Sequence, residues 1–314
     1  MASYVQQGSV SSVAGGIAST PSITGVTAGN TLVCVLSMYS SSNPTATAPT
    51  DSSGQTWSIL AQSAYQNPKK VAIFYLFNAA AGTHSLSMPS TTGPQVAQVV
   101  EYKGLLAVGG TAVAAGSSSF TTSQSSGNYT PSQANEVVIA VCGVDSSTNP
   151  ETLSDPPTGW TSLGAQQNGA TYSPVEFCYR ETSSTTPVSA TWSWTTAGAS
   201  AIVVAGLKYY NSPIINTQPV QQSVASGSTA TFSVSATTSG GALSYQWYLN
   251  SVLISGATSS SYTTPTLTNA DNGNTYYCAV TDAGGVTNTA TVYLFIIGES
   301  SGDGDKINSA WFAR

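Results

Sequence analysis

The chain has 314 residues, of which only 6% are charged, and its formal net charge is −6. Seven Lys and Arg residues cannot form the basic surface that follows a phosphate backbone or an anionic membrane. Apolar runs are also much shorter than the ~20 residues that a membrane-spanning helix needs. Neither nucleic-acid binding nor membrane insertion is therefore expected, and the surface must consist of Ser, Thr, Asn, Gln and Gly.

The four cysteines do not form the pattern of a secreted disulfide framework. Cys34 and Cys278 each stand alone in their part of the chain, and only Cys142 and Cys178 share one. Because such a framework has even counts within each module, buried free thiols are predicted, while pairing of Cys142 with Cys178 stays open. The N-terminal residues also lack the basic and apolar regions of a signal peptide, so export by that route is not expected.

The first two thirds of the chain contain an internal repeat. Asn30–Leu36 recurs as Asn135–Val141, and Asp51–Trp57 recurs as Asp155–Trp160. A period of about 105 residues is far longer than that of a solenoid and indicates a duplicated domain. The shared residues are strand centres and turns, with no shared cluster of reactive groups. This duplication favours a scaffold for display or assembly over a catalyst.

Both copies have the composition of β-strands. Runs of β-branched and aromatic residues are bounded by Gly, Pro, Asn and Ser, and several runs are apolar throughout, as in strands that lie between two sheets. The chain is therefore predicted to be all-β, with two tandem, duplicated, jelly-roll-like β-sandwich domains at residues 1–104 and 105–211. Strands are expected at residues 31–39, 71–77, 96–102, 136–144, 175–180 and 201–209.

A different pattern occupies residues 212–297. It contains Tyr245-Gln246-Trp247-Tyr248 and, farther on, Tyr276-Tyr277-Cys278. With the Asp271–Gly273 turn before the second motif, this segment resembles the immunoglobulin-like domains of bacterial and phage surface proteins. The resemblance implies a third β-sandwich.

The resemblance also implies a structural core for this third domain. Trp247 is expected to pack between the sheets, and Tyr276 to form a tyrosine corner whose hydroxyl bonds back to the chain after the preceding turn. The family's cysteine partner of Cys278 is replaced here, at Val234. The domain is therefore expected to be stable without the disulfide bond of its relatives.

The last segment, residues 298–314, changes character again. It begins with an acidic, glycine-rich linker and ends in a compact peptide with an aromatic pair. Aromatic side chains dominate many interfaces, so Trp311, Phe312 and Arg314 are candidate docking residues, with a frayed terminus as the alternative.

No cluster of catalytic or metal-binding side chains stands out. His84 is the sole histidine, expected in a turn before a strand, and the matching position of the second copy lies near Val188, so a Ser-His-Asp triad is not expected. No cofactor or metal ion is predicted, and the chain is expected not to be an enzyme. A glycoside-hydrolysing pair of carboxylates would have to come from Glu101, Glu151, Asp155, Glu176 and Glu181.

As a whole, the chain resembles accessory proteins of tailed-bacteriophage virions, such as capsid decoration, head-fibre and tail proteins. The resemblance implies a non-enzymatic structural protein of the virion surface, made in the host cytoplasm, present in many copies or as a homo-oligomer. Its implied partners are other virion proteins of the capsid or tail lattice and, through weak adhesion, a glycan of the bacterial cell surface. The alternative is an extracellular bacterial adhesin or carbohydrate-binding protein without its leader.

Overall fold

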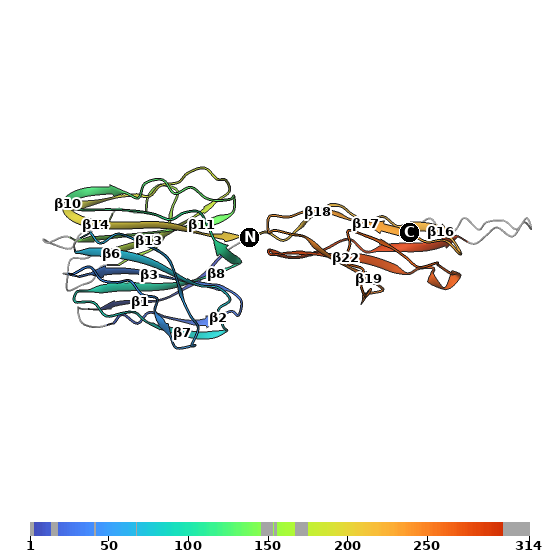
Figure 1. Cartoon of the computed structure of the whole chain (residues 1–314), viewed down its shortest axis with the longest axis horizontal. Helices are drawn as coiled ribbons and strands as arrows, with labels where there is room; N and C mark the ends of the chain where they lie inside the picture. The colour runs from blue at the N-terminus through green and yellow to red at the C-terminus, as the bar shows by residue number, and fades with distance from the viewer. Residues whose placement is uncertain are drawn as a thin grey trace, which may run out of the picture. The chain divides into compact units, whose positions relative to one another are not determined.

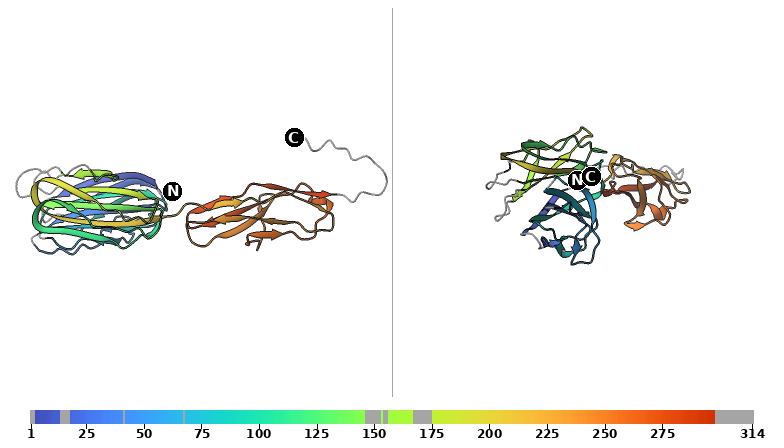
Figure 2. Two further views of the ribbon diagram at one scale, coloured as in Figure 1. Left: turned by 90° about the horizontal axis from the view of Figure 1, so that it is seen from above. Right: turned by 60° about the vertical axis from the view of Figure 1, so that its left-hand side comes forward.

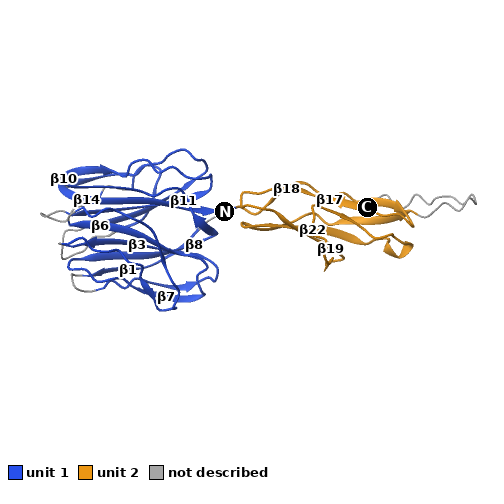
Figure 3. Ribbon diagram, viewed as in Figure 1, with its two compact units in different colours: residues 1–210 blue, residues 211–314 orange. Residues whose placement is uncertain are grey.

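The computed structural model describes residues 3–13, 18–40, 42–66, 68–145, 153, 156–166 and 175–297. The chain forms two compact units, Met1–Tyr210 and Asn211–Arg314 (Figure 3). The predicted boundary between residues 104 and 105 falls inside unit 1, so the division of the first two thirds into two domains stays a prediction. The predicted all-β fold of β-sandwich layers is confirmed.

The first repeat contributes a five-stranded antiparallel sheet and a smaller sheet to unit 1. The larger sheet has the strand order β1-β8-β3-β6-β5, and the smaller one has the order β2-β7-β4. Their bounds are β1 Ser3–Val13, β2 Ser22–Val26, β3 Thr31–Tyr39, β4 Thr50–Asp51, β5 Ser58–Gln62, β6 Lys69–Leu76, β7 Gly82–Ser87 and β8 Gln95–Lys103.

The second repeat builds a sheet with the same strand order. Its sheet runs β10-β14-β11-β13-β12, and β9 also pairs with β14. Read in the same direction, β10, β14, β11, β13 and β12 occupy the positions of β1, β8, β3, β6 and β5. The two copies of the sequence repeat therefore form sheets of the same topology. The bounds are β9 Leu105–Val108, β10 Val113–Ser125, β11 Glu136–Asp145, β12 Thr161–Gln166, β13 Val175–Thr182 and β14 Thr191–Tyr209.

The two large sheets pack face to face, which explains the strands that are apolar throughout. One face of each sheet contributes to a shared core that includes Val35 and Ile73 from the first repeat and Ile139 and Val203 from the second. The opposite face of each large sheet contributes to a second core, which is formed within its own repeat. In the right-hand view of Figure 2, the first repeat (blue) and the second (green to yellow) lie one above the other. Because both faces are buried, no polar alternation appears in these strands.

The central strands of the two repeats approach each other closely at Gly143 of β11. A Cβ atom at this position would lie 2.6 Å from Ser37 Oγ of β3 and 3.1 Å from a methyl carbon of Val71 in β6. Glycine is therefore required here by the contact between the sheets.

Replacing Gly143 with Ala is expected to destabilise unit 1 by about 1–3 kcal/mol, because the new methyl group overpacks the shared core. Urea unfolding followed by tryptophan fluorescence measures the loss. The matched control is the double variant S37A/G143A, in which the nearest clashing atom is gone and part of the stability should return. Equal losses in the single and double variants would contradict this account.

Unit 2 is an immunoglobulin-like β-sandwich. Its largest sheet has the order β16-β24-β22-β19-β20, with β23 also paired to β22, and β15-β18 and β17-β21 form two-stranded sheets (Figure 1). The bounds are β15 Ile214–Thr217, β16 Gln222–Ala225, β17 Thr231–Ser233, β18 Ser235–Thr237, β19 Ser244–Leu249, β20 Val252–Leu253, β21 Ser261–Thr263, η1 Asn269–Asp271, β22 Thr275–Asp282, β23 Gly285–Asn288 and β24 Val292–Ile297.

The core residues expected from the immunoglobulin resemblance lie in one buried cluster. Trp247 in β19 is paired with Cys278 in β22, and Val234 belongs to the same cluster. The Trp247 indole donates a hydrogen bond to the Ser259 carbonyl oxygen at 2.9 Å. Packing of Val234 and Cys278 in this cluster thus takes the place of the disulfide bond that the sequence resemblance implied.

Tyr276 differs from the expected tyrosine corner. Its ring is buried and stacks on Phe232, with 4.4 Å between ring centroids. Its hydroxyl makes no hydrogen bond to any residue that the structure describes. The turn is instead closed by Asp271, whose carboxylate accepts bonds from the backbone N–H and the hydroxyl of Thr268. The expected hydroxyl bond of Tyr276 is therefore wrong, because a capping carboxylate takes over the role.

All four cysteines are buried and carry free thiols, so Cys142 and Cys178 do not form a disulfide bond. Burial raises the pKa of the Cys34 thiol well above its usual range, and raises that of Cys278 to about 11. These thiols behave as small apolar core groups, as predicted.

Candidate functional site

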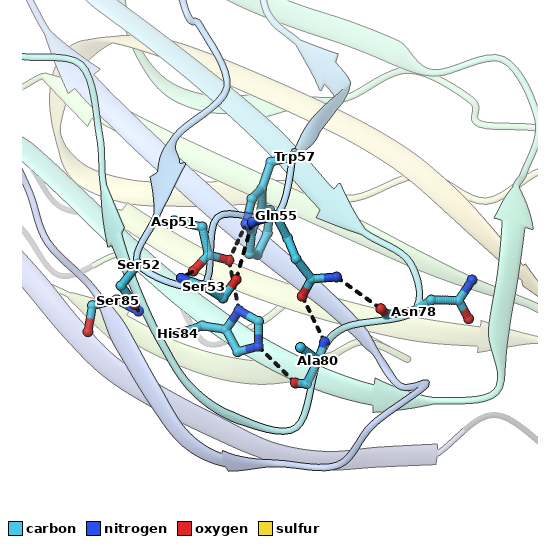
Figure 4. A network of polar contacts seen from close by, with 9 residues as sticks. All are labelled: Asp51, Ser52, Ser53, Gln55, Trp57, Asn78, Ala80, His84 and Ser85. Carbon is cyan, nitrogen blue, oxygen red and sulfur yellow. Dashed lines mark hydrogen bonds and ion pairs between the residues drawn. The ribbon is translucent and has the colours of Figure 1, made fainter.

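The sole histidine lies in a closed polar network of the first repeat (Figure 4). His84 lies within β7, not in the expected turn, and its Nδ1 atom is 2.7 Å from Asp51 Oδ2. The same carboxylate oxygen accepts a bond from the Trp57 indole at 2.9 Å, and Oδ1 accepts one from the Ser53 backbone N–H. The side chains of His84 and Asp51 are both shielded from solvent.

Both ring nitrogens of His84 are engaged, which leaves none for catalysis. Nε2 lies 3.0 Å from the Ala80 carbonyl oxygen, which only accepts, so Nε2 must carry a proton. Nδ1 lies against the Asp51 carboxylate, so each ring nitrogen has a hydrogen-bonding partner. Burial alone would raise the pKa of Asp51, but bonds from His84, Ser53 and Trp57 outweigh it and hold that pKa below its ordinary value. The network stabilises the fold and has no free base for a nucleophile.

The second repeat retains the tryptophan of this network without the histidine. Trp160 is buried like Trp57, but its indole donates to the Ser189 carbonyl oxygen at 3.1 Å. Val188, paired with Tyr129, occupies the position that His84 has opposite Ile23. A buried tryptophan is thus common to both repeats, and the histidine–aspartate pair is particular to the first.

Three of the five candidate carboxylates for glycoside hydrolysis lie in the described residues, and they do not form a pair in a cleft. Glu101 is fully buried and accepts bonds from Asn30, Thr27 and Gln6. Glu176, in the other repeat, is buried against the Trp192 indole at 2.7 Å. Glu181 is exposed, while Glu151 and Asp155 lie outside the described residues. Glu101 and Glu176 are thus closed off from solvent and leave exposed Glu181 without a second described candidate beside a bound sugar.

A buried cation lies where the two repeats meet. Lys69 lies on the same face of β6 as Val71 and Ile73 of the shared core, and it is 1% exposed. Its ammonium lies 5.9 Å from the centroid of the Tyr39 ring. Burial lowers the pKa of Lys69 to about 8, against the opposing attraction of Asp145 in the second repeat. No pattern in the sequence marks this lysine, because its burial depends on the contact between the repeats.

The part of the chain that the structure describes offers no metal-binding cluster of His, Cys, Asp and Glu. It also contains no helix long and apolar enough to span a membrane. A surface groove of about 300 Å³ in the second repeat is lined by Arg180, Glu181 and the Ser- and Thr-rich segment 182–189. Aromatic side chains do not line this groove.

Exposed aromatic and aliphatic side chains gather on one face of unit 2. In β24, β22 and β19, Leu294, Cys278 and Trp247 point into the core. The residues next to them point to the opposite face of the sheet, where those of β24 are exposed and those of β22 and β19 are half-buried. We name this set the aromatic band: Leu253 of β20, Tyr248 of β19, Tyr277 of β22, and Tyr293, Phe295 and Ile297 of β24.

The rings of the aromatic band are ordered against one another across the sheet. Tyr248 and Tyr277 are direct cross-strand partners and stack with 4.6 Å between centroids and an interplanar angle of 1°. Tyr293 and Phe295 stack along β24 at 6.3 Å. Within the described residues, the hydroxyls of the three tyrosines make no hydrogen bond. The sequence carried a signal for this face: residues 292–297 are apolar at every position, whereas a strand with one solvated face should alternate.

The electrostatics of unit 2 are unusually simple. Residues 211–297 contain Asp271 and Asp282 and no Lys, Arg, Glu or His. Neither aspartate is part of the aromatic band. This face is therefore both apolar and uncharged.

The docking residues predicted from the sequence, Trp311, Phe312 and Arg314, lie outside the described residues. Their role stays a prediction.

Comparisons with known proteins give structural neighbours only. No family model matches the chain, and no curated protein matches it. A tandem of titin domains I9–I11 is 13% identical, with 95% of this chain and 100% of that chain covered and a TM-score of 0.26. The ectodomain of mouse nectin-like molecule 4 is 14% identical, with 83% and 94% covered and a TM-score of 0.25. Likeness at these scores supports no conclusion about function.

Proposed function

We propose that the chain is a non-enzymatic structural protein of the virion surface of a bacteriophage, with an adhesive face on unit 2. The observation that carries the proposal is the contrast between the protein's buried polar side chains and its exposed aromatic ones. The buried His84–Asp51 pair and the buried glutamates are closed by their own hydrogen bonds, whereas most side chains of the aromatic band are exposed and its tyrosine hydroxyls make no hydrogen bond within the described residues. A surface of this kind marks an interaction site more often than a reaction site.

The duplicated body and the near-absence of charge support the structural part of the proposal. The repeats bury one sheet face of each copy against the other, which gives a stable body without disulfide bonds. A protein present in many copies gains avidity from weak contacts, so a modest adhesive face is sufficient for attachment.

Locating the protein tests this proposal. Mass spectrometry and immunogold electron microscopy of gradient-purified particles should find the chain on the particle surface. Recovery only as free protein in the culture medium would overturn the virion assignment in favour of the alternative, a secreted adhesin or carbohydrate-binding protein.

Deleting residues 298–314 is expected to abolish incorporation into particles, because the predicted docking residues Trp311, Phe312 and Arg314 are then lost. Quantitative mass spectrometry of particles measures the change, and circular dichroism checks folding. The double variant W311A/F312A should reproduce the loss, whereas the control I307A should incorporate normally. Normal incorporation of the deletion would remove the docking role.

A further inference from the structure

The aromatic band has the exposure of a binding face. Tyr293 is 52% exposed, Phe295 41%, Ile297 56% and Leu253 53%, while Tyr248 and Tyr277 between them are half-buried. In the strand pairing, Tyr293 lies opposite Thr275, and Tyr277 follows two positions along the same strand, so the band runs diagonally across neighbouring strands of one sheet. It therefore presents a continuous surface and not scattered apolar residues.

We propose that the aromatic band binds a neutral polysaccharide chain. This inference rests on the adhesive function proposed above and names the ligand class of that face.

The charges of residues 211–297 favour a neutral polymer over an anionic one. The 211–297 segment has no cationic side chain, and its two charges are both carboxylates. A phosphate-, sulfate- or uronate-bearing polymer would meet no basic group and would be repelled by Asp271 and Asp282. A neutral chain has no such penalty, and its binding should not depend on salt.

The hydroxyl groups favour a sugar over a second copy of this chain. Burying the phenols of Tyr248, Tyr277 and Tyr293 without partners would cost free energy. The band itself offers few partners to a second copy: Thr275 already donates its hydroxyl hydrogen to Asn250, and the amide of Gln246 already donates to two carbonyl oxygens. A sugar ring carries donors and acceptors around its whole rim and C–H groups on its faces. It can thus satisfy the phenols while covering the rings.

The test uses the full chain in native affinity electrophoresis, with gels that contain mannan, dextran or galactan, and alginate as an anionic polymer. The wild-type protein should be retarded by at least one neutral polysaccharide and not by alginate, equally at low and high salt. The variant Y293S/F295S should lose the retardation. The control I214S removes a side chain that is 64% exposed on β15, in another sheet, and should migrate like the wild type.

A second variant guards against a change in folding. Y277F keeps the stacked ring and removes only a hydroxyl, so it should weaken retardation about two- to tenfold, as expected for the loss of one hydrogen bond. No retardation by any neutral polymer, or equal retardation of Y293S/F295S, would overturn the inference. So would a concentration-dependent dimer in analytical ultracentrifugation that Y293S/F295S abolishes, because a second copy would then occupy the band. Particle incorporation is measured separately, so failure here leaves the structural role intact.

Discussion

Replacing Asp51 with Asn is expected to lower the free energy of unfolding of unit 1 by about 3 kcal/mol, because a buried charged group that accepts several hydrogen bonds is lost. Oδ2 of Asp51 accepts bonds from His84 and Trp57, and Oδ1 accepts one from the Ser53 N–H. An amide has a single acceptor oxygen, so its NH₂ group must face one of these donors in either orientation.

Urea unfolding of the full chain measures this loss. Four of the six tryptophans lie in unit 1, so fluorescence reports mainly on that unit. The matched control is E181Q, which removes an exposed carboxylate of the same unit and should change stability by less than about 0.5 kcal/mol. A double-mutant cycle with H84Q should give a coupling well above zero. If D51N and E181Q behaved alike, the buried pair would not stabilise the fold.

The same pair gives a pH dependence at the acid end. Because the pKa of Asp51 is lower in the folded chain, its contribution is present above the unfolded-state pKa of about 3.9 and is lost as pH falls through the folded-state value. D51N should remove this part of the acid sensitivity.

The repeat could be predicted from the sequence because strand centres and turns recur in order. Asn30–Leu36 and Asn135–Val141 indeed lie in or beside β3 and β11, the central strands of their sheets. That these sheets share one core could not be predicted, because an apolar strand has the same composition whichever layer covers it. The burial of Lys69 and the need for glycine at position 143 depend on that contact, so they could not be predicted from the sequence either.

The closed network at Asp51 shows a second limit. Asp51 and His84 are far apart in the sequence, and they meet because β4 pairs with β7, with Asp51 opposite Leu86. Strand order is not encoded in local patterns, so the sequence left His84 as an isolated residue. In unit 2, the resemblance to immunoglobulin-like domains placed Trp247 in the core, where it lies. It did not reveal that Asp271 replaces the Tyr276 hydroxyl in closing the turn.

Lys69 is expected to make the stability of unit 1 rise with pH above neutrality. Burial between the repeats lowers its pKa from 10.5 to about 8. Between these values the unfolded chain binds a proton that the folded chain has released, so this group's contribution to the free energy of unfolding increases with pH. Below pH 8 both states are protonated, and the folded chain bears the full cost of a buried ammonium.

Replacing Lys69 with Met isolates this contribution. The four thiols also titrate in the unfolded chain at alkaline pH, but wild type and K69M share them, so the difference between the two proteins reports on Lys69 alone. K69M should be the more stable protein at pH 7, and its advantage should shrink by about 2 kcal/mol between pH 7 and pH 9.5. Urea unfolding at several pH values measures the difference, with K103M, which removes an exposed lysine of the same unit, as the control that should show no such trend. An advantage of K69M that stays constant with pH would mean that the ammonium is hydrated in the folded chain, and that the two repeats do not close over it.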